Sequence, residues 1–182
     1  MTAAIYNITV EQGSTFTRNF YFGQGAQVKI TSYADAGGGV TTVAYTGKDP
    51  ANDDRIVIIN SKYYTGTWTV AAVDTNANTF TIATAFEATE TGTYWMDAWP
   101  LTGHTYAGSI KENYGDSASI EDFTTALTDA AGGHLTVSLT SAETTALTSG
   151  KYYYDIEQTN TATTAVERIL KGVCNVSPEI TT

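Results

Sequence analysis

The sequence is poor in the residues that most often carry chemistry. Its 182 residues include one cysteine, two histidines and three prolines. The lone cysteine, Cys174, has no partner for an internal disulfide, and its apolar neighbours predict a small core residue, with an intermolecular bridge as the alternative. A zinc site needs clustered cysteine and histidine. The composition therefore predicts no metal site of that kind.

Charge is also scarce, and long apolar runs are missing. The chain has 9 Lys and Arg against 19 Asp and Glu, for a net charge of −10, and the basic residues are scattered. Phosphate contacts need clustered Lys and Arg, so we expect no direct nucleic-acid partner. No run approaches about 20 apolar residues, and residues 1–13 lack a basic segment followed by an apolar stretch. We expect no membrane span, no signal peptide and synthesis in a host cytoplasm.

The motifs of nucleophilic and phosphate chemistry are absent as well. His104 and His134 stand beside glycines at expected strand starts, which is typical of solvated turn histidines. There is no G-x-S-x-G elbow, and Gly37–Gly39 is a turn, not a phosphate loop. The sequence predicts no catalytic residue, no cofactor and no enzyme. A hydrolase that depends on His104 is the remote alternative.

Carboxylates are present but badly placed for catalysis. Asp53–Asp54 and Glu121–Asp122 are adjacent pairs, and neighbouring residues of a strand point to opposite faces. A calcium loop is an alternative to a solvated turn for four side chains: Asp49, Asn52, Asp53 and Asp54. Their spacing does not match the usual calcium loop, so the solvated turn is favoured.

What the sequence does contain is alternation with a period of two. Thr and Tyr, which favour pleated surfaces, are abundant. We expect strands over Ile5–Val10, Thr15–Phe22, Val40–Tyr45, Arg55–Asn60, Thr65–Val73, Asn78–Ala83, Thr93–Asp97, Thr105–Ile110, Leu135–Leu139, Lys151–Gln158 and Ala165–Val176.

Three further segments need their own interpretation. Ile120–Leu127 fits a helix or a strand, and its threonine pair favours the strand. Ser141–Leu147 predicts one helical turn with Ser141 as N-cap. Gly172 suggests a bulge in the last strand.

The spacing of these strands predicts an all-β protein with two modules. About seven strands lie outside residues 30–97 and about five lie inside. Seven strands fit an immunoglobulin-like (Ig-like) β-sandwich, which residues 1–29 and 98–182 would form as a discontinuous domain. Five short strands could close a small β-barrel, which makes residues 30–97 an insert.

Five segments outside the insert occur in an order that resembles a known family. They are Val10–Phe16 (VEQGSTF), Leu101–Ile110 (LTGHTYAGSI), Leu135–Leu147 (LTVSLTSAETTAL), Gly150–Glu157 (GKYYYDIE) and Arg168–Ile180 (RILKGVCNVSPEI). Together they resemble the Ig-like domain that opens many tailed-phage tail proteins, including the upper-baseplate proteins.

The insert resembles a second module that recurs in phage proteins. Its segments are Arg55–Ile59, Tyr64–Thr67, Val70 and Asn78–Ile82. The module is a small β-barrel similar in shape to the barrel half-domain of ubiquitin-activating enzymes, a likeness that implies no ubiquitin chemistry.

These resemblances imply a structural protein of the virion. We expect a tail or baseplate subunit, or a head–tail connector or adaptor, whose partners are other virion subunits in a homo-oligomeric ring or cluster. A capsid decoration (cement) protein and a receptor- or carbohydrate-binding module are the alternatives. The 12 tyrosines and three tryptophans supply candidate contacts, since Tyr and Trp are enriched at binding hot spots. We take Tyr63, Tyr64, Trp95 and Trp99 as candidate interface residues, with core packing as the other interpretation.

Overall fold

The computed structural model describes residues 3–179 and has an all-β fold. Strands make up 57% of it, and the one short helix of the described residues is α1 (Ser141–Ala146), so the predicted class is confirmed. The strands form one eight-stranded and one seven-stranded sheet. No helix within residues 3–179 has the length and hydropathy needed to cross a membrane.

The chain divides into two compact units, which we describe separately. Unit 1 is drawn from Met1–Asn19, Gly103–Thr128 and Leu135–Thr182, and unit 2 from Phe20–Thr102 and Asp129–His134. The sequence had placed the boundaries at 29/30 and 97/98. In the structure, this segment of unit 2 is longer at both ends and runs from Phe20 to Thr102. It is longer because the strand that begins at Gly23 pairs with the strand that ends at Ala98.

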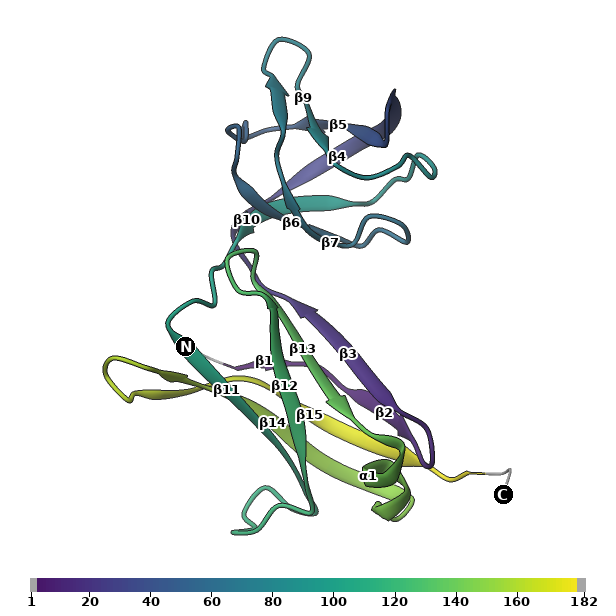
Figure 1. Ribbon diagram of the computed structural model, residues 1–182, viewed down its shortest axis with the longest axis vertical. Helices are drawn as coiled ribbons and strands as arrows, with labels where there is room; N and C mark the ends of the chain where they lie inside the picture. Colours follow the sequence, from purple (N-terminus) through teal and green to yellow (C-terminus); the bar gives the residue numbers. More distant parts are fainter. Residues whose placement is uncertain (1–2, 180–182) are drawn as a thin grey trace. The chain divides into compact units, whose positions relative to one another are not determined.

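Unit 1 contains the eight-stranded sheet (Figure 1). Its strands are β1 (Ala4–Ile5), β2 (Ile8–Glu11), β3 (Phe16–Tyr21), β11 (His104–Lys111), β12 (Glu121–Asp129), β13 (His134–Leu139), β14 (Gly150–Asn160) and β15 (Val166–Ser177). Their order is β1-β15-β14-β11-β12-β13-β3, and β2 also pairs with β15. The segment that fitted a helix or a strand is therefore the strand β12.

The order of these strands makes the sheet of unit 1 curl. β2 pairs in parallel with β15 at one end of the sheet, and β3 lies at the other end. Only the four residues from 12 to 15 separate β2 from β3. A chain this short brings the two ends of the sheet close together. Alternate residues then point into a common core, among them Val10, Ile110, Leu135, Ile156 and Cys174.

Gly172 has a different role from the bulge that the sequence suggested. The register of β14 and β15 shifts between Ile156 and Glu157, and Gly172 pairs regularly with Tyr154. A Cβ atom at Gly172 would overlap the carbonyl oxygen of Tyr6. Glycine is therefore needed there because another backbone passes close to it.

The N-cap of α1 lies one residue earlier than the sequence predicted. Thr140, not Ser141, is the N-cap, and its side chain accepts a hydrogen bond from the Glu143 N–H. Glu143 Oε2 accepts one from the Thr140 N–H at 2.7 Å, which completes a capping box. The Thr144 hydroxyl donates to the Ser14 carbonyl at 2.9 Å and ties the helix to the turn between β2 and β3.

Unit 2 contains the seven-stranded sheet. Its strands are β4 (Gly23–Gly37), β5 (Val40–Thr46), β6 (Arg55–Ile59), β7 (Gly66–Thr69), β8 (Ala72–Asp74), β9 (Thr79–Ile82) and β10 (Tyr94–Ala98), in the order β7-β6-β10-β4-β5-β9-β8. The predicted single strand Thr65–Val73 is wrong, because it forms β7 and β8 at opposite ends of this sheet. The sheet curls into a half-barrel.

The core of unit 2 is rich in aromatic side chains. Trp95 has no exposed surface and meets the rings of Tyr45 and Phe80 edge-on, at centroid distances of 6.2 and 5.9 Å. Tyr33 and Tyr64 stack at 4.3 Å. Such pairs add about 0.5–1.5 kcal/mol beyond the burial of their area.

Sequence reasoning missed β4, the longest strand. Only Val28, Ile30 and Tyr33 are buried along its 15 residues, so its hydrophobic pattern is weak. Two shifts of register against β5 also break the period of two.

Candidate interaction surface

Each of the two histidines is the first residue of a strand. His104 opens β11, and the hollow beside it, about 290 Å³, is lined by no Asp, Glu, Cys or Lys. His134 opens β13 and packs its ring against Tyr21 at 4.6 Å. Burial lowers the pKa of His134, so its neutral form is favoured.

The acidic side chains that could have held calcium are used to shape a turn. Asp54 Oδ2 accepts the Ala51 N–H at 2.7 Å, and Asp49 Oδ1 accepts the Tyr45 hydroxyl at 2.8 Å. Burial and the neighbouring Asp49 carboxylate raise the pKa of Tyr45 to about 12, so this hydroxyl remains a donor. No group of three metal-ligating side chains occurs in residues 3–179.

Cys174 is a core residue, as the sequence predicted. Its side chain is fully buried, and burial raises the pKa of its thiol to about 11. The thiol therefore stays protonated near neutral pH and is shielded from reagents in the folded chain.

The four predicted interface aromatics are all found in unit 2, but they do not form one surface. Tyr64 and Trp95 are 1% and 0% exposed, so they stabilise the core and present nothing to a partner. Trp99 is half-buried, and its backbone N–H donates to the Phe22 carbonyl. Tyr63 is 43% exposed and lies under the Lys62 ammonium. Of the four, Tyr63 keeps a largely exposed ring for contact.

A better candidate lies on unit 1, on the outer face of β11, β14 and β15. Tyr154 and Ile156 of β14 are buried, so Tyr153 and Asp155, which alternate with them, face outward. The ladder places Lys111 beside Tyr153 and Ser109 beside Asp155. The alternation that the sequence analysis used to find the core could have identified this face from the intervening residues.

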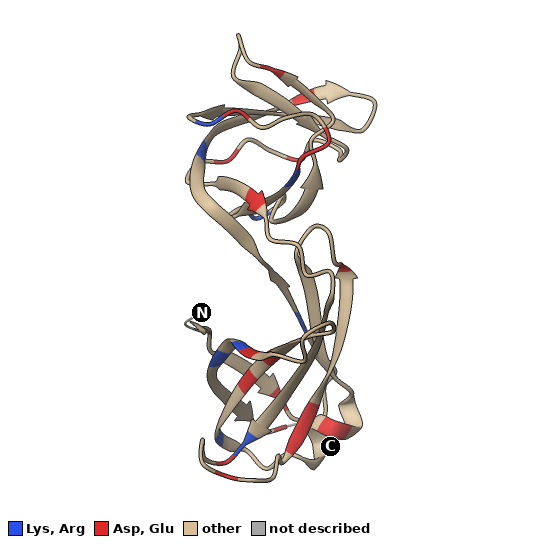
Figure 2. Ribbon diagram, turned by 90° about the vertical axis from the view of Figure 1, so that its left-hand side faces the viewer, with Lys and Arg blue, Asp and Glu red and all other residues tan. Residues whose placement is uncertain are grey.

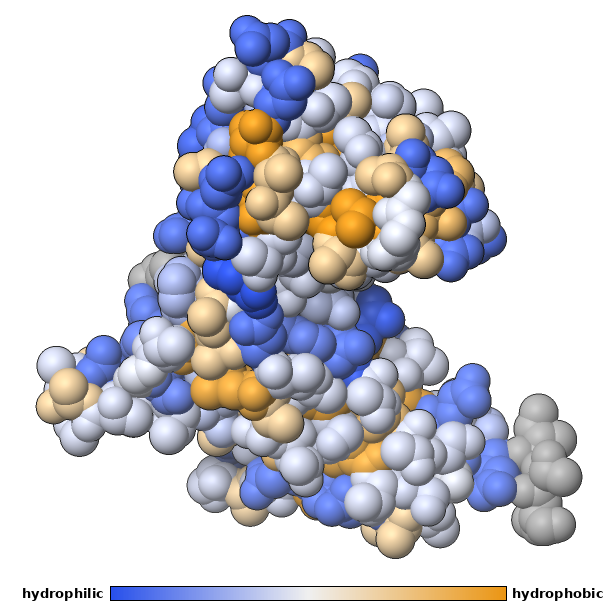
Figure 3. Space-filling view, turned by 45° about the horizontal axis from the view of Figure 1, so that its top comes forward, coloured by the Kyte–Doolittle hydropathy of each residue, from blue (hydrophilic) through white to orange (hydrophobic). Residues whose placement is uncertain are grey.

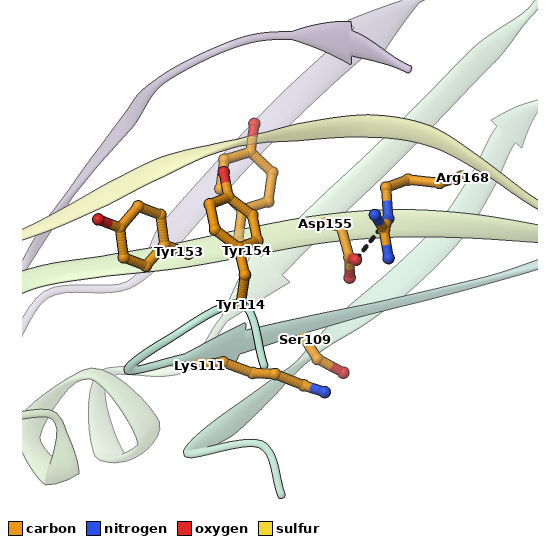
Figure 4. Close-up of a pocket in the computed structure, with 7 residues that line it drawn as sticks. All are labelled: Ser109, Lys111, Tyr114, Tyr153, Tyr154, Asp155 and Arg168. Carbon is orange, nitrogen blue, oxygen red and sulfur yellow. Dashed lines mark ion pairs between the residues drawn. The ribbon is translucent and has the colours of Figure 1, made fainter. Parts of the chain in front are cut away.

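These side chains surround a shallow hollow that the loop after β11 partly covers (Figure 4). The ring of Tyr114, from that loop, packs on Tyr153 at a centroid distance of 4.4 Å. Lys111 Nζ donates to the Asp116 carbonyl at 2.9 Å, which ties the same loop to β11. The hollow holds about 40 Å³, enough for a few water molecules only. It is too small to enclose a substrate.

An ion-pair network fixes the other side of this hollow. Arg168 Nε lies 2.7 Å from Asp155 Oδ2 (Figure 4). The Nη2 atom of the same side chain lies 3.6 Å from Glu157 Oε1. Ser109 donates to Asp122 Oδ1 at 2.7 Å. Exposed pairs of this kind add at most about 1 kcal/mol each, but several together hold the side chains in place. The face is therefore preorganised and polar.

Tyr114 is the side chain of this face that protrudes most. It is 58% exposed, although it is one of the largest apolar side chains. We call the face formed by Lys111, Tyr114, Tyr153, Asp155 and Arg168 the tyrosine face. A partly exposed aromatic surrounded by fixed charged groups is the composition of a protein-binding hot spot with a polar rim.

Charge and hydropathy elsewhere are consistent with contacts of modest size. Among the residues that Figure 2 describes, the basic ones are few and are interspersed with acidic ones. On the view of Figure 3, apolar residues form small groups separated by polar ones. Large apolar patches mark obligate interfaces or membrane contact, and that view has none.

The chain matches no family model, and no curated protein is similar to it in sequence.

Proposed function

We propose that the chain is a structural subunit of a tailed-phage virion, a part of the tail or baseplate or a head–tail connector, that acts through protein–protein contacts. It has no catalytic role in this proposal. The tyrosine face and the exposed Tyr63 are its candidate contacts with other subunits. We further propose that unit 1 is an Ig-like sandwich and unit 2 a small β-barrel.

The observation that carries the proposal is the strand order of unit 1. In Ig-like sandwiches, strands B, E and D share one sheet and strands C, F and G share the other. If β2 is strand A, then β3-β13-β12 corresponds to B-E-D, and β11-β14-β15 corresponds to C-F-G. The longer segment of unit 2, Phe20–Thr102, then lies in the connection between strands B and C, and its shorter segment, Asp129–His134, lies in the turn between strands D and E. This order supports the resemblance to phage tail proteins, which rested on short motifs alone.

In unit 2, the barrel proposal is supported by the short connection between the two ends of its half-barrel sheet. The first and last strands of its sheet, β7 and β8, are separated by only Val70 and Ala71. Val70 exchanges hydrogen bonds with Asp53 and Asp54 on one side, and the Ala71 N–H donates to Thr81 on the other. A barrel completed in this way would leave few edges open, as suits a module that must stay soluble before assembly.

The experiment is mass spectrometry and electron microscopy of purified phage particles, with and without the gene for this chain. We expect the chain in intact particles, and particles without it to lack part of the tail or its attachment. Intact tails on fragile heads would identify a decoration protein instead. Complete particles that fail to adsorb would identify a receptor- or carbohydrate-binding module. Absence of the chain from purified particles would refute all three.

The tyrosine face can be tested in the same particles. Replacing Tyr114 by Ala should reduce incorporation of the chain, because an exposed anchor is lost while the fold is kept. Ile120→Ala is the matched control, since Ile120 is a 45% exposed apolar residue of the same loop. Equal incorporation of both variants would show that the tyrosine face is not the contact.

A further inference from the structure

Unit 1 has an open seam between two strands that follow each other in sequence. β2 and β3 are four residues apart, a spacing that usually gives a hairpin. Instead β2 pairs with β15, and β3 ends the sheet with β13 as its strand neighbour. Two hollows of about 220 and 300 Å³ lie along the two strands. We define the seam by the residues that line them: Tyr6, Asn7, Ile8, Thr9, Glu11, Ser14, Thr15, Phe16, Thr17 and Arg18.

The register of β3 on β13 follows from two contacts. The Phe22 N–H donates to the Gly133 carbonyl at 2.8 Å, and the Thr136 hydroxyl donates to Asn19 Oδ1 at 2.9 Å. Both fit one antiparallel register, in which Phe22 lies opposite Gly133 and Asn19 lies opposite Thr136. In such a ladder, successive residues direct their N–H and C=O groups alternately toward the neighbouring strand and away from it.

This register determines which backbone groups face the seam. Phe16, Arg18 and Phe20 have the same parity as Phe22, so their N–H groups point toward β13. The N–H and C=O groups of Thr17 and Asn19 consequently point toward the seam, where an added strand would bind them. Both of these residues are exposed.

Arg18 is the unusual residue of the seam. It alternates with Phe16 and with the buried Phe20, so its side chain is on the inner face of β3. It is nevertheless exposed, and its guanidinium lies 4.9 Å from the centroid of the Tyr6 ring. An inward arginine can stay hydrated because the seam is open. Inward-pointing charges are also a known protection of strand edges against unselective pairing.

We propose that the seam accepts an extended segment of another protein, which pairs with the edge of β3 and carries an Asp or Glu opposite Arg18. The backbone groups of Thr17 and Asn19 would supply the main-chain hydrogen bonds of strand addition. The added strand would also remove water from Arg18. A desolvated guanidinium without a partner is costly, whereas a bidentate carboxylate compensates it. Arg18 therefore selects acidic strands.

A second copy of β3 does not meet this requirement. Its sequence, FTRNFY, contains no acidic residue and brings a second arginine instead. The donor is thus a different segment, and the inference does not depend on a place in the virion.

The test uses three synthetic peptides and the full chain. Each peptide has nine residues of alternating threonine and valine, with glutamate, glutamine or lysine at the central inward position. Titration followed by NMR should show the glutamate peptide binding at least about tenfold more tightly than the lysine peptide. Arg18→Glu should reverse that order, because the charge that selects the peptide is reversed.

A proline variant tests the backbone part of the proposal. Thr17→Pro removes an N–H that faces the seam and leaves the ladder with β13 intact, so peptide binding should fall about tenfold. Thr17→Val keeps the N–H and should bind as the wild type does. If Thr17→Pro fails to fold, a glutamate peptide with alternate N-methylated residues tests the same edge, because it loses the N–H groups that would donate to the Thr17 and Asn19 carbonyls. Equal binding of the glutamate and lysine peptides, binding insensitive to N-methylation, or no binding at millimolar concentration would each overturn the proposal.

Discussion

Units 1 and 2 differ in how the two ends of their sheets are connected. In each, the two ends of one curled sheet are joined by a few residues. In unit 2 the joining residues Val70 and Ala71 hydrogen-bond to the strands on both sides. In unit 1 the Gln12 N–H bonds to Ser177, on the β15 side, and the edge of β3 stays open. Whether a short connection bonds to one edge or to both decides whether an edge remains available to a partner.

The cores of the units differ as well. Unit 2 is built around aromatic side chains, and it contains all three tryptophans of the chain, Trp68, Trp95 and Trp99. The fully buried large residues of unit 1 are aliphatic, such as Leu135, Leu139 and Ile156. Tryptophan fluorescence therefore reports on unit 2 alone, which allows the stability of the two units to be measured separately.

The largest effect is expected from Trp95→Ala. Removing this fully buried ring should destabilise unit 2 by about 3–5 kcal/mol, because it leaves a cavity beside Tyr45 and Phe80. Denaturation followed by the fluorescence of Trp68 and Trp99 measures it, and hydrogen exchange of β14 and β15 should remain unchanged. Loss of protection in β14 and β15 at the same time would show that the two units unfold together.

The next effect is expected in unit 1, from Gly172→Ala. The new Cβ would overlap the Tyr6 carbonyl and push the N-terminal strands off β15, at a cost of about 1–3 kcal/mol. Hydrogen exchange of unit 1 measures it, and the fluorescence transition of unit 2 should not move. Gly115→Ala, where the added atom meets nothing within 4 Å, is the matched control. Equal stability of the two variants would contradict the close approach of Tyr6.

A smaller effect should follow from removing the cap of α1. Thr140→Ala loses the hydroxyl of the capping box and should cost unit 1 about 1 kcal/mol. Thr140→Ser keeps an equivalent oxygen and should restore most of the stability. Chemical denaturation monitored by hydrogen exchange of unit 1 makes the comparison. If serine restores nothing, the effect comes from packing of the threonine methyl group.

The smallest effect is the pH dependence that His134 gives to unit 2. This residue belongs to unit 2, although the strand β13 that it begins continues into unit 1. Burial lowers the pKa of His134 below its ordinary value of 6.5, so the unfolded chain takes up the proton more readily. The contribution of the neutral His134 to the free energy of unfolding is therefore present above pH 6.5 and is lost as the pH falls below 6.5. The fluorescence midpoint should thus drop between about pH 7.5 and about pH 5.5. The drop should shrink in His134→Gln, and an unchanged slope there would assign the dependence to other groups.

Sequence reasoning succeeded where a strand buries one face regularly. The predicted strand Arg55–Asn60 corresponds to β6, and Lys151–Gln158 lies within β14. It failed for β4, which buries few residues, and for Thr65–Val73, where local alternation continues across a change of sheet edge. Alternation reports which face is buried and contains nothing about which strand is the neighbour.

The candidate surface could be predicted only in part for the same reason. The sequence does not distinguish an exposed aromatic residue from a buried one. Tyr64 and Trp95 were therefore predicted as interface residues, although both are in the core. Tyr114 had no pattern of its own, because it comes from a loop and becomes notable only where it packs on Tyr153.

The sequence by itself determined the all-β class and the buried thiol, since composition and local periodicity are enough for these. Tertiary structure alone decided which edges close and which aromatics are exposed. It also decided that Arg18 faces inward beside an open seam. These properties depend on pairing between residues far apart in the chain, and hydrophobic burial drives such pairing without specifying it in any single segment.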